Sequence, residues 1–154
     1  MKTAENVLYP NAIVGTKVTN YADSHTLGLP KEITDYHAWI CETQERANYC
    51  ISTFQGKSLV WLARLAGAKR GKSKSIATIQ MTYERRIHVL MLLLVLEVGC
   101  YLGFSAAVWS FAVGPEGSVT GLEYSEEYAQ TARSKLDGLG IKNVEFKVGP
   151  ASER

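Results

Sequence analysis

The C-terminal part of the sequence alternates short apolar runs with helical patterns. Segments 104–112 and 126–139 have the composition of helices, and Ser125 stands at the N-cap position of the second. The apolar runs before, between and after them are VLEVG (95–99), VTGLE (119–123) and VEFKV (144–148). Runs of this length that end in glycine or a turn are typical of buried parallel strands. Strand and helix alternate with short turns, which predicts an α/β fold that begins a doubly wound parallel sheet.

Helical patterns precede this sheet. Apolar residues at helical spacing follow Pro30 and predict a helix over 31–47. A face rich in leucine and alanine predicts a second helix from Thr53 to a stop at Gly67. Residues 1–30 carry many turn signals, and we expect a short helix and loops there.

Residues 68–94 follow neither pattern. They open with the basic stretch AKRGKSKS and close with RRIHVLMLLL, and the part between has weak periodicity. The sequence therefore divides into an N-terminal helical region (1–67), an atypical insertion (68–94) and a βαβαβ part (95–154).

Composition narrows the class of protein. The chain has 154 residues, of which 46% are hydrophobic and 21% charged, so it is globular and long enough to bury a core. A net charge of +2 favours neither a nucleic-acid binder nor an acidic tail. The three cysteines, Cys41, Cys50 and Cys100, have no zinc spacing and form no even disulfide set, which indicates a reducing compartment. With no apolar signal core and no run of membrane length, the sequence predicts a cytoplasmic protein without membrane or nucleic-acid partners.

A glycine-containing turn follows the first predicted strand. It reads EVGCYLGFS from Glu97 to Ser105, between strand and helix, where ligands bind in such sheets. A dinucleotide-binding turn needs G-x-G-x-x-G, but Tyr101 stands at the second glycine position. That bulk argues against a pyrophosphate, and Glu97 suits a cationic ligand better than a diphosphate.

Glu123 ends the second predicted strand. A carboxylate at this position can accept both hydroxyls of a ribose. Each feature alone has a plainer interpretation: Gly99 and Gly103 could make only a tight turn, and Glu123 could be a solvated strand end. Ser105 could simply lie in a first helical turn. Their combination at this spacing favours a ligand site.

The combination resembles class I S-adenosylmethionine-dependent methyltransferases, and more narrowly the metal-dependent O-methyltransferases of the caffeoyl-CoA and catechol type. The resemblance rests on VLEVGCYLGFSAAVWSFAVGPEGSVTGLEYSEEYAQTARSKLDGLGIKNVEFKVGPA and on the preceding YCISTFQGKSLVWLARLAGAKR. It implies the N-terminal half of a Rossmann-like methyltransferase sheet, preceded by N-terminal helices. It also implies methyl transfer to a hydroxyl of a small, typically aromatic acceptor.

The resemblance assigns cofactor contacts by position, and no catalytic residue is assigned. Glu97 and Gly99 would lie against the methionine moiety, where Ser105 would add a hydrogen bond and Cys100 its backbone, and Gly103 would complete the turn. Glu123 would bind the ribose, Ala151 would contact the adenine through its backbone, and Ile51 would line the entrance to the site. No residues have the spacing of metal ligands, because the three histidines are scattered.

The sequence departs from this family at its metal site. The family binds a divalent cation, magnesium or similar, through carboxylates and an asparagine on later strands, which would follow Arg154. We therefore expect the metal in the full-length family but not its site in this sequence. The alternative to an active enzyme is a truncated, catalytically inactive cofactor-binding fragment, and a third interpretation is a basic interaction module over 64–86. The sequence does not identify the methyl acceptor, and it leaves open whether the chain forms a homodimer.

The second departure is the interruption between AKR and VLEVG. Residues 71–94 separate two segments that the family joins directly. We favour a translated intron, because Gly71-Lys72-Ser73 is what GGTAAGTC encodes, and this stretch contains the common splice donor GTAAGT. Leu94-Val95 can be encoded as CTA-GTN, which places an AG acceptor in the matching phase. The alternative is a genuine surface insertion, which proteins tolerate well.

Overall fold

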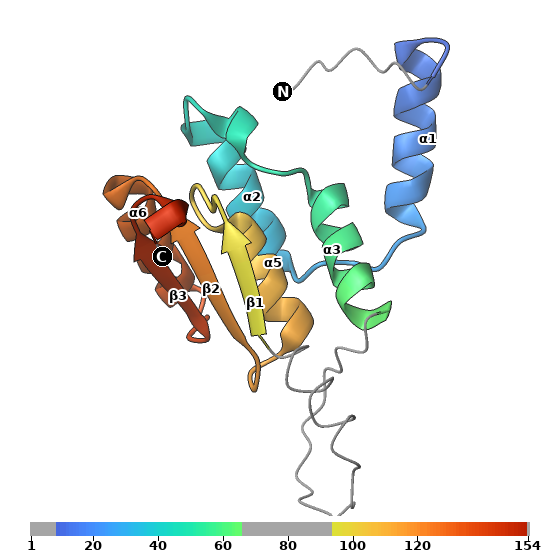
Figure 1. Cartoon of the computed structure of the whole chain (residues 1–154). Helices are drawn as coiled ribbons and strands as arrows, with labels where there is room; N and C mark the ends of the chain where they lie inside the picture. The colour runs from blue at the N-terminus through green and yellow to red at the C-terminus, as the bar shows by residue number, and fades with distance from the viewer. Residues whose placement is uncertain (1–8, 66–93, 154) are drawn as a thin grey trace, which may run out of the picture.

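A computed structural model of the chain describes residues 9–65 and 94–153 (Figure 1). Its strands are β1 (Leu94–Val98), β2 (Ser118–Glu123) and β3 (Val144–Val148). Its α-helices are α1 (Ala12–Ser24), α2 (Lys31–Thr43), α3 (Thr53–Leu65), α5 (Phe104–Val113) and α6 (Glu126–Gly138), and two short 3₁₀ turns are η1 (Ala47–Tyr49) and η2 (Ala151–Glu153). The elements expected from the apolar runs after residue 94 are all present.

The three strands form one parallel sheet in the order β1-β2-β3. Val95 lies opposite Val119, which in turn lies opposite Val144. Helix α5 connects β1 to β2, and α6 connects β2 to β3, as parallel neighbours require. The predicted α/β class with a partial doubly wound sheet is confirmed.

One face of the sheet is covered by helices and carries the core. Helix α5 packs against β1 and β2 on one side and against α2 and α3 on the other. Its buried residues are Phe104, Ala106, Ala107, Val108, Ser110, Ala112 and Val113. The approach of α3 is close, since a Cβ on Gly56 would come within 3.2 Å of the Val108 side chain. Small residues on α5 and α3 therefore set the spacing of these layers.

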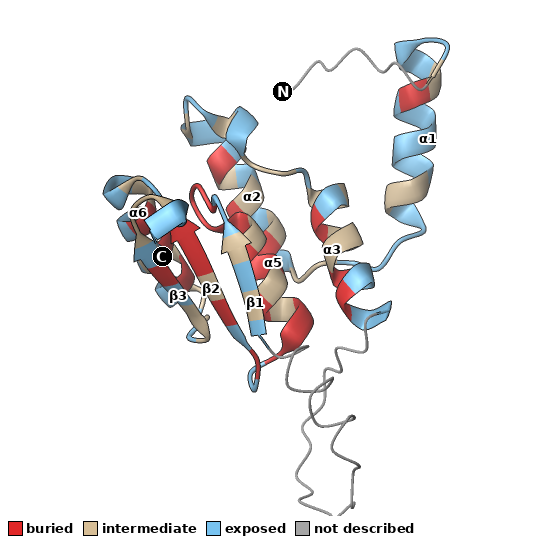
Figure 2. Ribbon diagram, in the orientation of Figure 1, coloured by how far each residue is buried: buried red, intermediate tan, exposed pale blue. Residues whose placement is uncertain are grey.

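The two faces of β1 have different environments. Leu94, Leu96 and Val98 remain 62–67% exposed, whereas Val95 is half-buried against the core (Figure 2). Because strand residues alternate between faces, Glu97 shares the covered face with Val95. In the described part of the chain, β1 pairs only with β2 and forms an edge of the sheet. This alternation places the Glu97 side chain beneath α5.

The helices before the sheet differ from prediction in one boundary. The helix expected over 31–47 ends at Thr43, because Gln44 is extended with ψ of 127° and Ala47–Tyr49 forms a 3₁₀ turn. Helix α3 begins as predicted, with Ser52 and Gln55 making a reciprocal capping box. Its expected stop at Gly67 lies outside the described residues. So do nearly all of the insertion over 68–94 and the proposed intron, whereas Leu94 begins β1.

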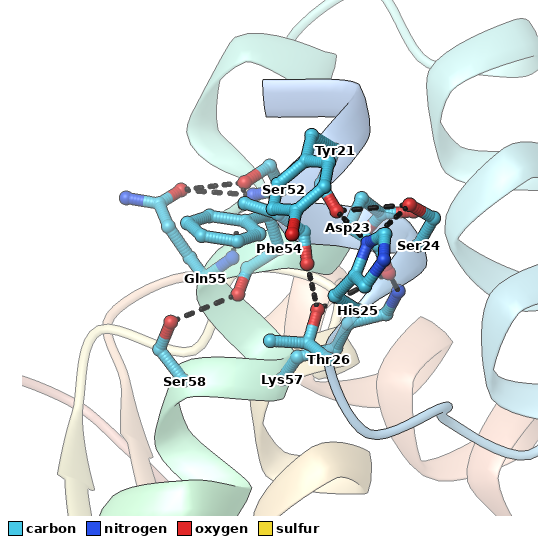
Figure 3. A network of polar contacts seen from close by, with 11 residues as sticks. Tyr21, Asp23, Ser24, His25, Thr26, Ser52, Phe54, Gln55, Lys57 and Ser58 are labelled. Atoms are coloured by element: carbon cyan, nitrogen blue, oxygen red, sulfur yellow. Dashed lines mark hydrogen bonds and ion pairs between the residues drawn. The ribbon is translucent and has the colours of Figure 1, made fainter. Parts of the chain in front are cut away.

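Helix α1 is fastened to α3 by a lysine (Figure 3). The Lys57 ammonium lies 2.7 Å from the Asp23 carboxylate and 3.0 Å from the Asp23 carbonyl oxygen. The Lys57 side chain is only 10% exposed, while Asp23 is 45% exposed. Gly15 is the one buried residue of α1. The ion pair is therefore a main anchor of this helix.

Lys57→Met should lower the free energy of unfolding by about 1–2 kcal/mol, because Asp23 loses a partner but can rehydrate. Urea denaturation measures the change. The matched control is Lys31→Met, which removes the fully exposed ion pair with Asp35 and should leave stability nearly unchanged. Equal losses in the two variants would show that Lys57 is not an anchor.

Candidate functional site

The site begins at the turn between β1 and α5. Gly99 has φ of +79°, Tyr101 +50° and Gly103 +81°, and the Gly103 N–H donates to the Cys100 carbonyl at 2.8 Å. A Cβ added at Gly99 would meet nothing within 4 Å. A positive φ requires glycine there for conformational reasons, and the open space leaves room for a ligand beside the backbone.

Close packing adds a second reason, besides its positive φ, for a glycine at position 103. A Cβ at this position would come within 3.0 Å of both the Ala132 and Phe146 side chains. Gly103 therefore lets the turn pack closely against α6 and β3. Its contact with the cofactor stays a prediction.

The Glu123 carboxylate holds the turn from the end of β2. Its Oε2 accepts the N–H of Cys100 at 3.1 Å and of Tyr101 at 2.7 Å, and its Oε1 accepts the Ser125 N–H at 2.9 Å. The residue is only 8% exposed. A carboxylate offers about four acceptor positions, so Oε1 retains capacity for one more donor. Glu123 thus joins two strand ends and remains able to accept a ligand hydroxyl.

Glu97 is a half-buried carboxylate beneath α5, and its Oε2 atom is buried. Burial raises the pKa of Glu97, and hydrogen bonds from Ser105, Cys100 and Trp109 oppose that rise. Its Oε2 has no hydrogen-bond partner among the described residues. A buried oxygen without a partner is costly, and a cationic donor would satisfy it. The structure brings Glu97 and Ser105 together, as the sequence predicted for one end of a ligand.

Cys100 contributes its backbone rather than its thiol. The side chain is 3% exposed, and its Sγ lies 3.6 Å from the Leu122 carbonyl oxygen. Burial raises the pKa of this thiol well above its ordinary value, so the sulfur stays protonated. A Cβ on Gly121 would lie 2.6 Å from the Sγ. The thiol therefore fills the space that glycine leaves on β2.

The other two predicted residues lie on neighbouring segments. The Ile51 carbonyl oxygen is 3.0 Å from Nε2 of His37, whose ring packs on Phe104 at the start of α5. Ala151 begins η2 just after β3, and the Gly149 N–H donates to the Glu123 carbonyl at 3.0 Å. Both segments thus adjoin the carboxyl ends of the strands.

Sequence reasoning missed an aromatic cluster at the turn. Tyr101 makes edge-to-face contacts with Tyr49 and Tyr128, at centroid distances of 5.7 and 4.8 Å. Tyr124, directly after Glu123, is 79% exposed. Tyr36 lies within the predicted helix 31–47, and its hydroxyl donates to the Leu102 carbonyl. The position of Tyr124 next to a strand-end carboxylate was the one available signal in the sequence.

Within residues 9–65 and 94–153, no three His, Cys, Asp or Glu side chains come together as a metal-binding group. None of the helices in these ranges has the length and apolarity needed to cross a bilayer.

One family model matches most of the chain. The model of the family "Protein-L-isoaspartate(D-aspartate) O-methyltransferase (PCMT)" matches residues 40–152. This range covers most of the described elements, from the end of α2 to η2, and includes every predicted cofactor residue.

Curated relatives match a shorter segment. A protein-L-isoaspartate O-methyltransferase of Ignicoccus hospitalis is 48% identical over 59 residues, which are 38% of this chain and 28% of the relative. A catechol O-methyltransferase of Mycobacterium tuberculosis is 43% identical over 58 residues, 37% of this chain and 26% of the relative. The match thus spans less than a third of these relatives.

Solved structures match over nearly the whole chain. The SAH-bound methyltransferase PaMTH1 of Podospora anserina has a TM-score of 0.71 at 22% identity, covering 94% of this chain and 53% of that one. An O-methyltransferase of Bacillus cereus in complex with SAH has a TM-score of 0.61 at 22% identity, covering 89% of this chain and 51% of that one. The fold, including the helices before the sheet, is therefore that of about half a Rossmann-like methyltransferase.

The raised pKa of Glu97 predicts how stability depends on pH. In the unfolded chain this carboxyl titrates near its ordinary value of 4.5, whereas the folded chain holds the proton to higher pH. The free energy of unfolding should therefore fall as pH rises above 4.5 through the raised pKa. Glu97→Gln should remove this loss and unfold at higher urea than the unsubstituted chain at pH 7.

The advantage of Glu97→Gln should disappear below pH 4.5. The matched control is Glu145→Gln, an exposed carboxylate on β3 whose loss should give no such pH-dependent gain. A Glu97→Gln variant that is less stable than the unsubstituted chain at pH 7 would contradict the burial of an unsatisfied charge.

Proposed function

The chain belongs to the protein-L-isoaspartate(D-aspartate) O-methyltransferase family, and from that premise we propose that it binds S-adenosylmethionine for methyl transfer to an oxygen. The observation that carries the proposal is the Glu123 carboxylate, which holds the glycine turn and keeps acceptor capacity at Oε1. The matched segment is about half the length of the solved relatives, so turnover by this chain is itself part of the proposal.

The adenosyl end of the ligand would lie where β2 and β3 end. Oε1 of Glu123 would accept one ribose hydroxyl. It would not accept both, because the other acceptor positions of the carboxylate already bind main-chain N–H groups. Tyr124 presents an exposed aromatic face beside it, suited to an adenine ring. Ala151 follows β3 on the same edge and would meet the adenine through its backbone.

The methionine end would lie over Gly99. The open space there admits a chain close to the backbone, and the orphan Oε2 of Glu97 suits the ligand's ammonium group. Ser105, which interacts with this carboxylate, would help to orient it. When bound, S-adenosylmethionine would supply the methyl group on its positively charged sulfur: the methyl carbon would pass to an acceptor oxygen as its bond to sulfur breaks, and S-adenosylhomocysteine would leave.

For the acceptor we propose a small hydroxylated aromatic molecule. The exposed ring of Tyr49, backed by Tyr101 and Tyr128, offers an aromatic surface next to the turn. The catechol O-methyltransferase of M. tuberculosis among the relatives supports this class. In the resembled enzymes a divalent metal assists, but the described residues include no group of three His, Cys, Asp or Glu side chains that could hold one.

The second candidate acceptor is an isoaspartyl carboxyl group in a protein. The family match and the I. hospitalis relative favour it. Both acceptors receive the methyl on oxygen, so the cofactor site is the same for either. The basic module over 64–86, a homodimer and a cytoplasmic location stay predictions.

Glu123→Gln should weaken binding of S-adenosylhomocysteine by about 10-fold or more. The substitution removes a charged acceptor, and the NH₂ group of the new amide, itself a donor, then faces main-chain N–H donors. Isothermal titration calorimetry measures the affinity. Glu116→Gln is the matched control, since it removes the same charge from an exposed turn at the start of β2. Equal affinity of the Glu123→Gln variant and the unsubstituted chain would refute this site.

Transfer of a labelled methyl group should discriminate the acceptors. We expect label from S-adenosylmethionine in a catechol, measured with and without Mg²⁺, and none in an isoaspartyl peptide. Label in the peptide alone would favour the second candidate. Binding of the cofactor without transfer to either would identify the chain as a catalytically inactive cofactor-binding fragment.

A further inference from the structure

Tyr36 is a buried tyrosine whose hydroxyl reaches the glycine turn from a different part of the fold. It lies on α2, is 5% exposed, and donates a hydrogen bond to the carbonyl oxygen of Leu102. We propose that Tyr36 is a positioning residue that holds the turn in its ligand-binding conformation. The proposal rests on the function proposed above.

The Tyr36 ring is fixed by its neighbours. It stacks on Trp39 at a centroid distance of 5.8 Å and an interplanar angle of 17°. The Lys135 ammonium of α6 lies 3.6 Å from the centre of the Trp39 ring, a cation–π contact on a second helix. Burial also raises the pKa of the Tyr36 hydroxyl well above its ordinary value. The hydroxyl is therefore a protonated donor with a fixed position.

Glu123 holds the turn by its N–H groups, and Tyr36 holds it by a carbonyl group. Glu123 accepts the N–H groups of Cys100 and Tyr101, and Tyr36 donates to the carbonyl of the next residue, Leu102. Between these anchors Tyr101 has φ of +50°, a conformation that side-chain-bearing residues adopt at a cost. Such a conformation persists only where surrounding contacts impose it.

Loss of the hydroxyl should therefore let the turn leave this conformation. If the ligand binds only the conformation that Tyr36 holds, its affinity falls in proportion to the fraction of chains that still adopt this conformation. The Tyr36 hydroxyl and the Leu102 carbonyl have no proposed contact with the ligand. Removing the hydroxyl should therefore lower the affinity for the ligand only by making the turn more mobile.

The test is Tyr36→Phe, which keeps the ring and removes the hydroxyl. Hydrogen exchange without ligand should speed up at the Cys100 and Tyr101 amides, and calorimetry should show about fivefold weaker binding of S-adenosylhomocysteine. The matched control is Ser110→Ala. It removes a hydrogen bond to Asn143, which itself bonds the Gly114 and Gly117 carbonyls at the opposite end of the sheet.

The control should lose stability while its turn exchange and affinity stay those of the unsubstituted chain. Unchanged turn exchange or unchanged affinity in Tyr36→Phe would overturn the proposal, as would equal effects from Ser110→Ala. If Tyr36→Phe does not fold in buffer, both measurements are made for all three chains in trimethylamine N-oxide, which favours the folded state. Failure of the unsubstituted chain to bind would refute the proposed function, whereas exchange separately reports whether Tyr36 holds the turn.

Discussion

The Glu123 carboxylate is the interaction on which the rest of the site depends. It accepts N–H groups from Cys100 and Tyr101 after β1 and from Ser125 before α6. Two strand ends and a helix start are thereby joined at one buried charge. An apolar residue there would leave three main-chain donors without acceptors, each at a cost of about 1–3 kcal/mol. The same carboxylate is the proposed ribose acceptor, so folding of the turn and recognition of the ligand use one group.

Close packing beneath the turn makes this arrangement specific. The Cys100 thiol occupies the space that Gly121 leaves, and Gly103 lies against Ala132 and Phe146. These contacts leave the turn little freedom from below, while Gly99 stays open above. The site is thus closed on the side of the sheet and open on the side where a ligand would enter. Tyr36, from a helix that precedes the sheet, completes the restraint.

The sequence predicts the strands well because their apolar runs are short, uninterrupted and separated by turn signals. It also predicts the Glu97–Ser105 and Glu123 positions, since chemistry at strand ends depends mainly on local spacing. It does not predict that Glu123 accepts three main-chain N–H groups, because that prediction would need the distance between the ends of β1 and β2. Tyr36 was missed for the same reason: its partner lies on a segment far away in the chain, and its helical spacing indicates only burial. The predicted end of α2, at residue 47, lies beyond the observed end at Thr43, because the pattern of apolar residues does not show that Gln44 is extended.

The most direct test of cofactor binding at the glycine turn held by Glu123 is a titration of the ¹⁵N-labelled chain with S-adenosylhomocysteine, followed by amide chemical shifts. Binding at this site predicts saturable shifts at Gly99, Cys100, Tyr101 and Ser125, with little change at Gly114 and Asn143 across the sheet. Shifts confined to the opposite end of the sheet, or no saturable shifts at the turn, would contradict it.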